Sequence, residues 1–174
     1  ITNKKILSDE KIVYLNYKDL YKDINSGERI FIDDGQIVIR VTKKTRSSLE
    51  GVVEIGGELR SNQGVAFPDT SLSVSSLTKK DISDLKYGNK LEVDIVAVSF
   101  VRNANDIKKV RKIIDSNIKI IAKIELKSAI KNLDSIIDEA DGVMVARGDL
   151  GVQLPLERVP FIQKQILDEA NAKG

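Results

Sequence analysis

The feature that most constrains the fold of this chain is a regular alternation of apolar segments with helix-period segments, which begins after Pro68. Short apolar runs that suit strands occupy residues 93–100, 118–125 and 142–146, and amphipathic stretches lie between them. Strands and helices of such lengths in strict alternation are typical of a parallel sheet or a β/α barrel. Three strands cannot close a barrel that needs eight, so we expect only part of one.

The helices expected in this part of the chain begin and end at recognisable signals. The run that starts at Thr78 resembles a capping box, and Gly88 suits the end of its helix. Pro160 suits the first turn of a last helix that ends at Gly174. Two further helices are expected, one at residues 104–115 and one around Ile130, Leu133 and Ile137.

The part of the chain before Pro68 has a different character. Its segments are short, alternate apolar with polar residues and are rich in β-branched side chains, which predicts a small all-β unit. Asp34-Gly35 supplies the positive φ angles of a tight hairpin turn. The expected strands lie at residues 11–15, 29–32, 37–39, 52–55 and 65–67, the last two as a pair.

Composition narrows the chemistry that a site in this chain can use. The 174 residues include no cysteine and no histidine, so thiolate catalysis and zinc sites built from these residues are excluded. An ion held by the remaining side chains would be a hard, oxygen-loving one such as Mg²⁺. The net charge of +2 gives no reason to expect nucleic acid or an anionic membrane as partner. No apolar run approaches the roughly 18–20 residues of a membrane span, and no signal-peptide pattern opens the chain.

Charged groups stand at the ends of two strands that should be buried. Lys123 and Glu125 share one face at the carboxyl end of a strand, and Asp149 follows the next strand in the same sense. Carboxyl ends of barrel strands carry the chemistry, so these groups should converge on one cleft. Two carboxylates and a few waters make a reasonable Mg²⁺ site, and a lysine beside it suits an anionic substrate. The turn at residues 147–151 offers the N–H groups of Gly148 and Asp149 to a carboxylate or phosphate.

Simpler interpretations of the same residues stay open. Lys123 and Glu125 can form an ion pair that caps a strand. Asp34 suits a hairpin turn as well as a contact with a ligand. Ser99 can serve a substrate or pack at the end of its strand, and Arg102 suits a salt bridge.

Four segments stand out in a fixed order along the chain, namely residues 31–35, 97–102, 122–125 and 143–152. Together they resemble the pyruvate kinase family, and the likeness spans nearly the whole chain. The resemblance implies an α/β protein in which a small all-β barrel domain, residues 1–68, precedes a partial (β/α)8 TIM barrel, residues 69–174. By this resemblance, the first is expected to be the lid inserted into the catalytic barrel, and the second is expected to hold its fourth to sixth strands with their helices.

The resemblance also implies an activity, the phosphoryl transfer from phosphoenolpyruvate to ADP that gives pyruvate and ATP in the last step of glycolysis. This chain is expected to supply the metal-binding sector of the site of a cytoplasmic homo-oligomer, usually a tetramer. The expected cofactor is Mg²⁺ or Mn²⁺. K⁺ is a further expected ion whose ligands lie outside this chain. No nucleic acid and no membrane is expected among the partners.

Residue roles are carried over from the resemblance position by position. Lys123 matches the lysine that offsets charge on the transferring phosphoryl group and the enolate oxygen. Glu125 and Asp149 match the metal ligands, and Gly148 and Asp149 match the backbone donors to the substrate carboxylate. The remaining residues expected in the cleft are Asp34, Ser99 and Arg147.

Two other hypotheses remain beside a pyruvate kinase. A related barrel lyase would act on phosphoenolpyruvate or pyruvate by carbon–carbon chemistry, although the β unit before the barrel strands argues against it. Alternatively, the chain by itself is a non-catalytic fragment, inactive because the remaining barrel strands lie outside it.

Overall fold

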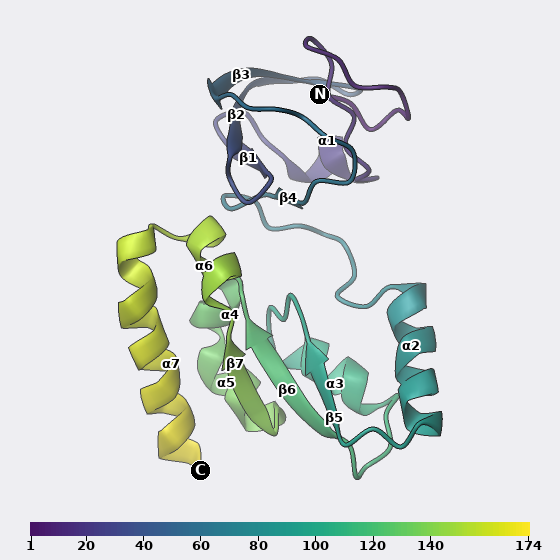
Figure 1. Ribbon diagram of the computed structural model, residues 1–174, viewed down its shortest axis with the longest axis vertical. Helices are drawn as coiled ribbons and strands as arrows, with labels where there is room; N and C mark the ends of the chain where they lie inside the picture. Colours follow the sequence, from purple (N-terminus) through teal and green to yellow (C-terminus); the bar gives the residue numbers. More distant parts are fainter. The chain divides into compact units, whose positions relative to one another are not determined.

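The computed structural model describes all residues from Ile1 to Gly174, and these form two compact units. The first unit is Ile1–Val74 and the second is Ser75–Gly174 (Figure 1). No helix combines the length and the apolar character that a membrane crossing requires.

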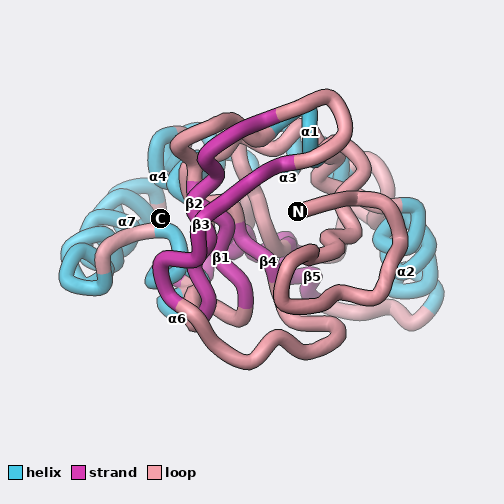
Figure 2. The backbone as a smooth tube through the Cα atoms, turned by 90° about the horizontal axis from the view of Figure 1, so that it is seen from above, coloured by secondary structure: helices cyan, strands magenta, loops and turns pink.

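A four-stranded antiparallel sheet with the strand order β3-β2-β1-β4 forms the frame of the first unit. A single short helix, α1, and long loops complete it, as the tube in Figure 2 shows. Its core is aliphatic and includes Leu20, Ile24, Ile30 and Leu49, all almost inaccessible to solvent. The elements are α1 Leu20–Asp23, β1 Arg29–Ile32, β2 Ile37–Lys44, β3 Leu49–Ile55 and β4 Val65–Ala66.

The turn between β1 and β2 confirms the hairpin predicted from Asp34-Gly35. Ile32 pairs with Ile37 across the two strands. Between them, Asp33, Asp34 and Gly35 take φ angles of 55°, 54° and 89°. Aspartate and glycine tolerate this left-handed region better than most other residues, so the residue types at these positions favour the tight turn.

Three predictions for the first unit were wrong. Strands β3 and β4 do not pair with each other, because they lie at the two opposite edges of the sheet. Residues 11–15 form no strand, and Tyr14 makes only an isolated bridge with Thr2. Leu15 is nevertheless buried. The alternation of apolar and polar residues at 11–15 therefore reflects packing against the core and not membership of the sheet. The unit is also not purely β, since it contains α1.

The second unit confirms the predicted alternation of strands and helices. Its three strands are parallel in the order β5-β6-β7, and each pairs with the next strand along the chain. The strands are β5 Ile95–Val98, β6 Lys119–Ile124 and β7 Gly142–Val145. The helices are α2 Lys79–Lys90, α3 Ala104–Arg111, α4 Lys127–Lys131, α5 Leu133–Glu139, α6 Arg147–Gln153, the 3₁₀ turn η1 Leu156–Arg158, and α7 Val159–Lys173.

One face of this sheet is packed and the other is open. Along β6, Ile120, Ala122 and Ile124 point into the core, where they meet apolar residues of the surrounding helices. On the other face, Ile95 and Met144 are largely exposed. Because side chains alternate along a strand, Lys123 lies on this open face.

Helix boundaries in the second unit follow the local signals in part. The capping box is present, since the side chains of Thr78 and Asp81 exchange hydrogen bonds with each other's backbone. Helix α2 continues to Lys90, past the glycine at which it was expected to stop. The single helix expected around residues 130–137 is divided at Asn132 into α4 and α5.

The predicted turn at residues 147–151 is a helix instead. Its two glycines favoured a turn, but the buried side chain of Leu150 anchors α6 in the core. The N–H of Leu150 donates to the carbonyl of Ala146, and the N–H of Leu154 donates to the carbonyl of Leu150. Packing of one leucine therefore outweighed the low helix propensity of the glycines.

Candidate active site

The carboxyl ends of β5, β6 and β7 lie along one edge of the sheet. Val98 pairs with Ala122, and Ile124 pairs with Val145, so the three strands end nearly level. Parallel strands place the residues that follow them at a common edge. Ser99 follows β5 directly, and Glu125 follows β6 directly.

Ser99, Lys123 and Glu125 meet at this edge. The Lys123 ammonium lies 2.5 Å from Glu125 Oε1 and donates a hydrogen bond of 2.9 Å to Ser99 Oγ. The Glu125 side chain is 1% exposed, whereas the Lys123 side chain is 26% exposed. The ion pair between Lys123 and Glu125 that was considered from the sequence is thus present. Its carboxylate is buried, and its lysine is partly exposed to solvent.

The backbone of Phe100 completes the contacts of Glu125. Its N–H donates to Glu125 Oε2 at 2.7 Å, so each carboxylate oxygen has one partner. Phe100 takes a φ of 54°, in the left-handed region that an aromatic residue rarely adopts. Sequence reasoning missed this group, since neither the unusual φ nor the hydrogen bond leaves a local signal in the residue types.

The residues that follow β7 are exposed and do not join this cluster. Arg147, Gly148 and Asp149 form the first turn of α6, and all three residues are exposed to solvent. First-turn N–H groups have no partner within a helix, so those of Gly148 and Asp149 are open to a ligand. No hydrogen bond or ion pair joins Asp149 to Lys123 or Glu125.

The donor set at this edge suits a hard cation with few protein ligands. The structure contains no group of three or more acidic side chains that would hold a metal by themselves. Glu125 uses one acceptor position on each oxygen and a carboxylate has about four, so further positions remain. Mg²⁺ usually takes only one or two carboxylates and completes its shell with water and substrate oxygens. Glu125 therefore has acceptor positions left for such an ion, and Asp149 offers a second carboxylate that is exposed.

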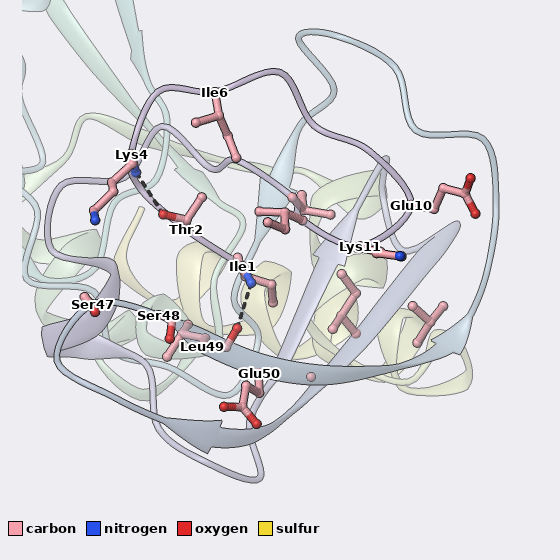
Figure 3. A pocket seen from close by; sticks show the side chains of 15 residues that line it. Ile1, Thr2, Lys4, Ile6, Glu10, Lys11, Ser47, Ser48, Leu49 and Glu50 are labelled. Atoms are coloured by element: carbon pink, nitrogen blue, oxygen red, sulfur yellow. Dashed lines mark hydrogen bonds between the residues drawn. The ribbon is translucent and has the colours of Figure 1, made fainter.

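Asp34 lies in the first unit, exposed at the tip of the β1–β2 hairpin. That unit also contains a cavity of about 560 Å³ walled by the N-terminal segment, β2 and β3. Figure 3 shows Lys4, Glu10 and Glu50 on different sides of it, so their charges do not converge on one point. None of the predicted site residues lines this cavity, and the sheet edge is therefore the stronger candidate.

Comparisons with known proteins show what this chain is similar to. A sequence model of the family described as pyruvate kinase, barrel domain, matches residues 1–174. The pyruvate kinase of Clostridium acetobutylicum is 40% identical over 178 residues, which cover 100% of this chain and 38% of the relative. Those of Clostridium perfringens and Thermotoga maritima are each 42% identical, covering 98% and 96% of this chain and 37% and 36% of the relatives.

The chain therefore spans well under half the length of these relatives. The family match, by contrast, extends over every residue of it. The chain belongs to the pyruvate kinase family.

Proposed function

We propose that this chain carries part of a site that transfers a phosphoryl group from phosphoenolpyruvate to ADP, giving pyruvate and ATP in the last step of glycolysis. The observation that carries the proposal is the buried carboxylate of Glu125 with the Lys123 ammonium 2.5 Å away, at the carboxyl end of a parallel strand. A buried ion pair adds little net stability, so its place at this edge favours a chemical role. Membership of the family supports the same activity.

Lys123 is the proposed catalytic residue. Its ammonium is held by Glu125 and Ser99 and reaches solvent, where a substrate can meet it. Phosphoryl transfer needs charge placed against the phosphoryl oxygens more than it needs covalent help. A lysine fixed in advance offsets charge on the phosphoryl group and on the enolate oxygen without reorganising during the reaction.

Glu125 and Asp149 would hold Mg²⁺ or Mn²⁺. Such an ion, when bound, neutralises phosphate oxygens and orients the substrate. The free N–H groups of Gly148 and Asp149 would bind the substrate carboxylate, with Ser99, Arg147 and Asp34 as further cleft residues. K⁺ would be bound by residues outside this chain.

The finer architecture is part of the same proposal. The second unit would be strands four to six of a (β/α)8 barrel, and the first unit a small β-barrel lid inserted in it. The parallel sheet with one open face, where Ile95 and Met144 are exposed, supports the barrel. We also propose a cytoplasmic homo-oligomer, with a tetramer as the expected form.

A second candidate is that the chain has no turnover by itself. Its coverage of only 36–38% of the relatives favours this candidate. A coupled assay for pyruvate formation by the 174-residue chain tests it directly, because turnover by the chain alone would exclude it. Carbon–carbon cleavage of a pyruvate adduct in place of phosphoryl transfer would instead favour a barrel lyase.

The sharper experiment replaces the matching segment of the Clostridium acetobutylicum pyruvate kinase with this chain. We expect the grafted enzyme to form pyruvate, and Lys123→Met to lower its kcat by about 100-fold or more with a smaller change in KM. Lys119→Met is the matched control, since Lys119 begins the same strand on the same face at the opposite end. An active graft in which both substitutions have equal effects would show that Lys123 is not catalytic.

A further inference from the structure

Two carboxylates are buried in this protein, and both bind the loop that follows β5. Asp106 is 2% exposed and Glu125 is 1% exposed, and no other polar or charged residue is buried. Glu125 accepts the N–H of Phe100 at 2.7 Å, and Asp106 accepts the N–H of Arg102 at 3.1 Å. The loop is thus held at two alternate residues by the only buried charges of the chain.

The conformation of this loop needs such support. Phe100 has a φ of 54°, although the residue is 59% exposed and gains little from burial. Left-handed backbone at a non-glycine residue persists only where its surroundings fix it. Between the two held residues, the side chain of Val101 is fully buried, which leaves the loop little freedom.

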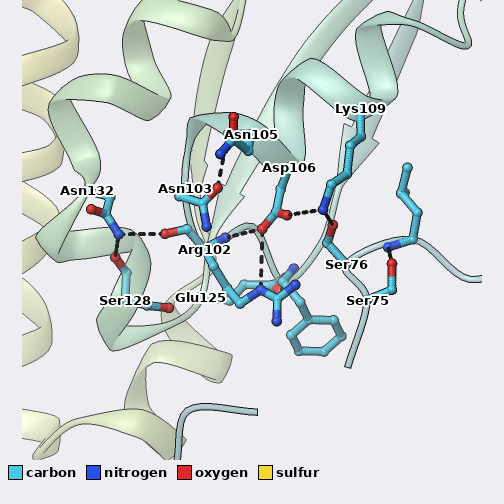
Figure 4. Close-up of polar contacts among 12 residues, drawn as sticks. Ser75, Ser76, Arg102, Asn103, Asn105, Asp106, Lys109, Glu125, Ser128 and Asn132 are labelled. Carbon is cyan, nitrogen blue, oxygen red and sulfur yellow. Dashed lines mark hydrogen bonds and ion pairs between the residues drawn. The ribbon is translucent and has the colours of Figure 1, made fainter. Parts of the chain in front are cut away.

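Asp106 is itself fixed by a set of cationic and hydroxyl groups. Its carboxylate lies 3.4 Å from Arg102 Nε and 3.3 Å from Lys109 Nζ, and Lys109 also donates to Ser76 Oγ (Figure 4). Burial alone would raise the pKa of Asp106, but hydrogen bonds from Ser76 and the Arg102 N–H, with the Arg102 charge, hold it below the ordinary value. The carboxylate is therefore ionised at neutral pH and its charge is compensated.

Helix capping does not explain this residue. Asp106 lies in the first turn of α3, but the N-cap is Asn103, whose side chain accepts the N–H of Asn105 at 3.0 Å. Asp106 reaches past the cap to Arg102, which lies in the loop and outside the helix. An acidic side chain that served only the helix would not need to leave solvent for this contact.

We propose that Asp106 is a positioning residue that fixes the loop after β5, so that the Phe100 N–H reaches Glu125 and Ser99 Oγ reaches Lys123. The catalytic meaning of this inference rests on the proposed function, but the positioning itself does not. Asp106 touches none of the groups assigned to the reaction and acts through the loop backbone. Releasing it lets Phe100 leave the left-handed region and withdraws partners from the Lys123–Glu125 pair.

The test measures amide hydrogen exchange on the 174-residue chain, which needs no turnover. In Asp106→Ala, exchange at the Phe100 amide should rise by about tenfold or more, while the β6 amides of Ala122 and Ile124 change by less than about threefold. The matched control is Asp141→Ala, which removes a carboxylate that accepts the N–H of Ile120 at 2.8 Å. This control should leave the Phe100 amide unchanged.

A uniform rise at all these amides would assign Asp106 to global stability, and an unchanged Phe100 amide would also overturn the inference. If the alanine variant does not fold, Asp106→Asn decides, since it removes the charge but keeps one oxygen that can still accept the Arg102 N–H, while an NH2 group replaces the oxygen that accepts from Lys109. The same selective pattern with a smaller rise is expected there, and its absence overturns the inference. An inactive grafted enzyme would count against the proposed function alone, because the exchange pattern does not depend on activity.

Discussion

The two ends of the β5–β7 sheet use similar groups in different settings. At the carboxyl end, Glu125 accepts a backbone N–H and pairs with Lys123, and its side chain is buried. At the amino end, Asp141 accepts the N–H of Ile120 and pairs with Arg111 and Lys119, but its side chain is 25% exposed to solvent. Exposed pairs cost little to form and add little stability, whereas a buried pair has a large desolvation cost. The pairs at the amino end therefore add a small stabilisation that solvent moderates, whereas the carboxyl end keeps a charge out of solvent at a cost in free energy.

The largest effect should come from breaking the buried pair on one side. Glu125→Ala leaves the Phe100 N–H and the Lys123 ammonium without their partner and should lower the free energy of unfolding by about 2–3 kcal/mol. Asp141→Ala at the amino end should cost about 1 kcal/mol, because solvent reaches the Arg111 and Lys119 cations that are left behind. Urea denaturation of the 174-residue chain measures both. Equal losses would remove the distinction between the two ends.

A smaller effect should appear in the pH dependence of the amino end. Burial alone would raise the pKa of Asp141, but the Ile120 N–H and the Arg111 guanidinium lower it below the ordinary value of 3.8. A lowered folded-state pKa gives stability that is present above the unfolded pKa and is lost as pH falls through the folded one. Asp141→Asn should thus be about 1 kcal/mol less stable than wild type at pH 7, and nearly equal to it at about pH 2. A difference that stays constant with pH would contradict this assignment.

The smallest effect concerns salt. Lys119 and Asp141 lie 3.5 Å apart with the lysine mostly in solvent, and a double-mutant cycle should give a coupling of about 0.5 kcal/mol. Because salt screens exposed charges, that coupling should vanish near 1 M NaCl. The coupling of Lys123 with Glu125, measured with Lys123→Met and Glu125→Gln, should persist there. Loss of both couplings in salt would show that the carboxyl-end pair is solvated like the other.

Local chemistry explains which parts could be predicted from the sequence. The Asp34-Gly35 turn and the shared face of Lys123 and Glu125 follow from φ preferences and from the period of a strand. The partners of β3 and β4 could not be predicted, because strand partners are chosen by contacts between residues far apart in sequence, and the two strands were wrongly expected to pair with each other. Phe100 at positive φ and the reach of Asp106 to its loop are tertiary effects that oppose local preference, and such effects leave no pattern in residue types.

The order of strands in each sheet bears on how the chain assembles during synthesis. In the second unit every strand pairs with the one made just before it, so each new strand can add to an existing edge as it leaves the ribosome. In the first unit, β4 must return to β1 after β2 and β3 have been made, and Phe31 meets Ala66 only at that point. Closing that longer loop is the slower event, so the first unit should wait for its last strand while the second unit grows step by step.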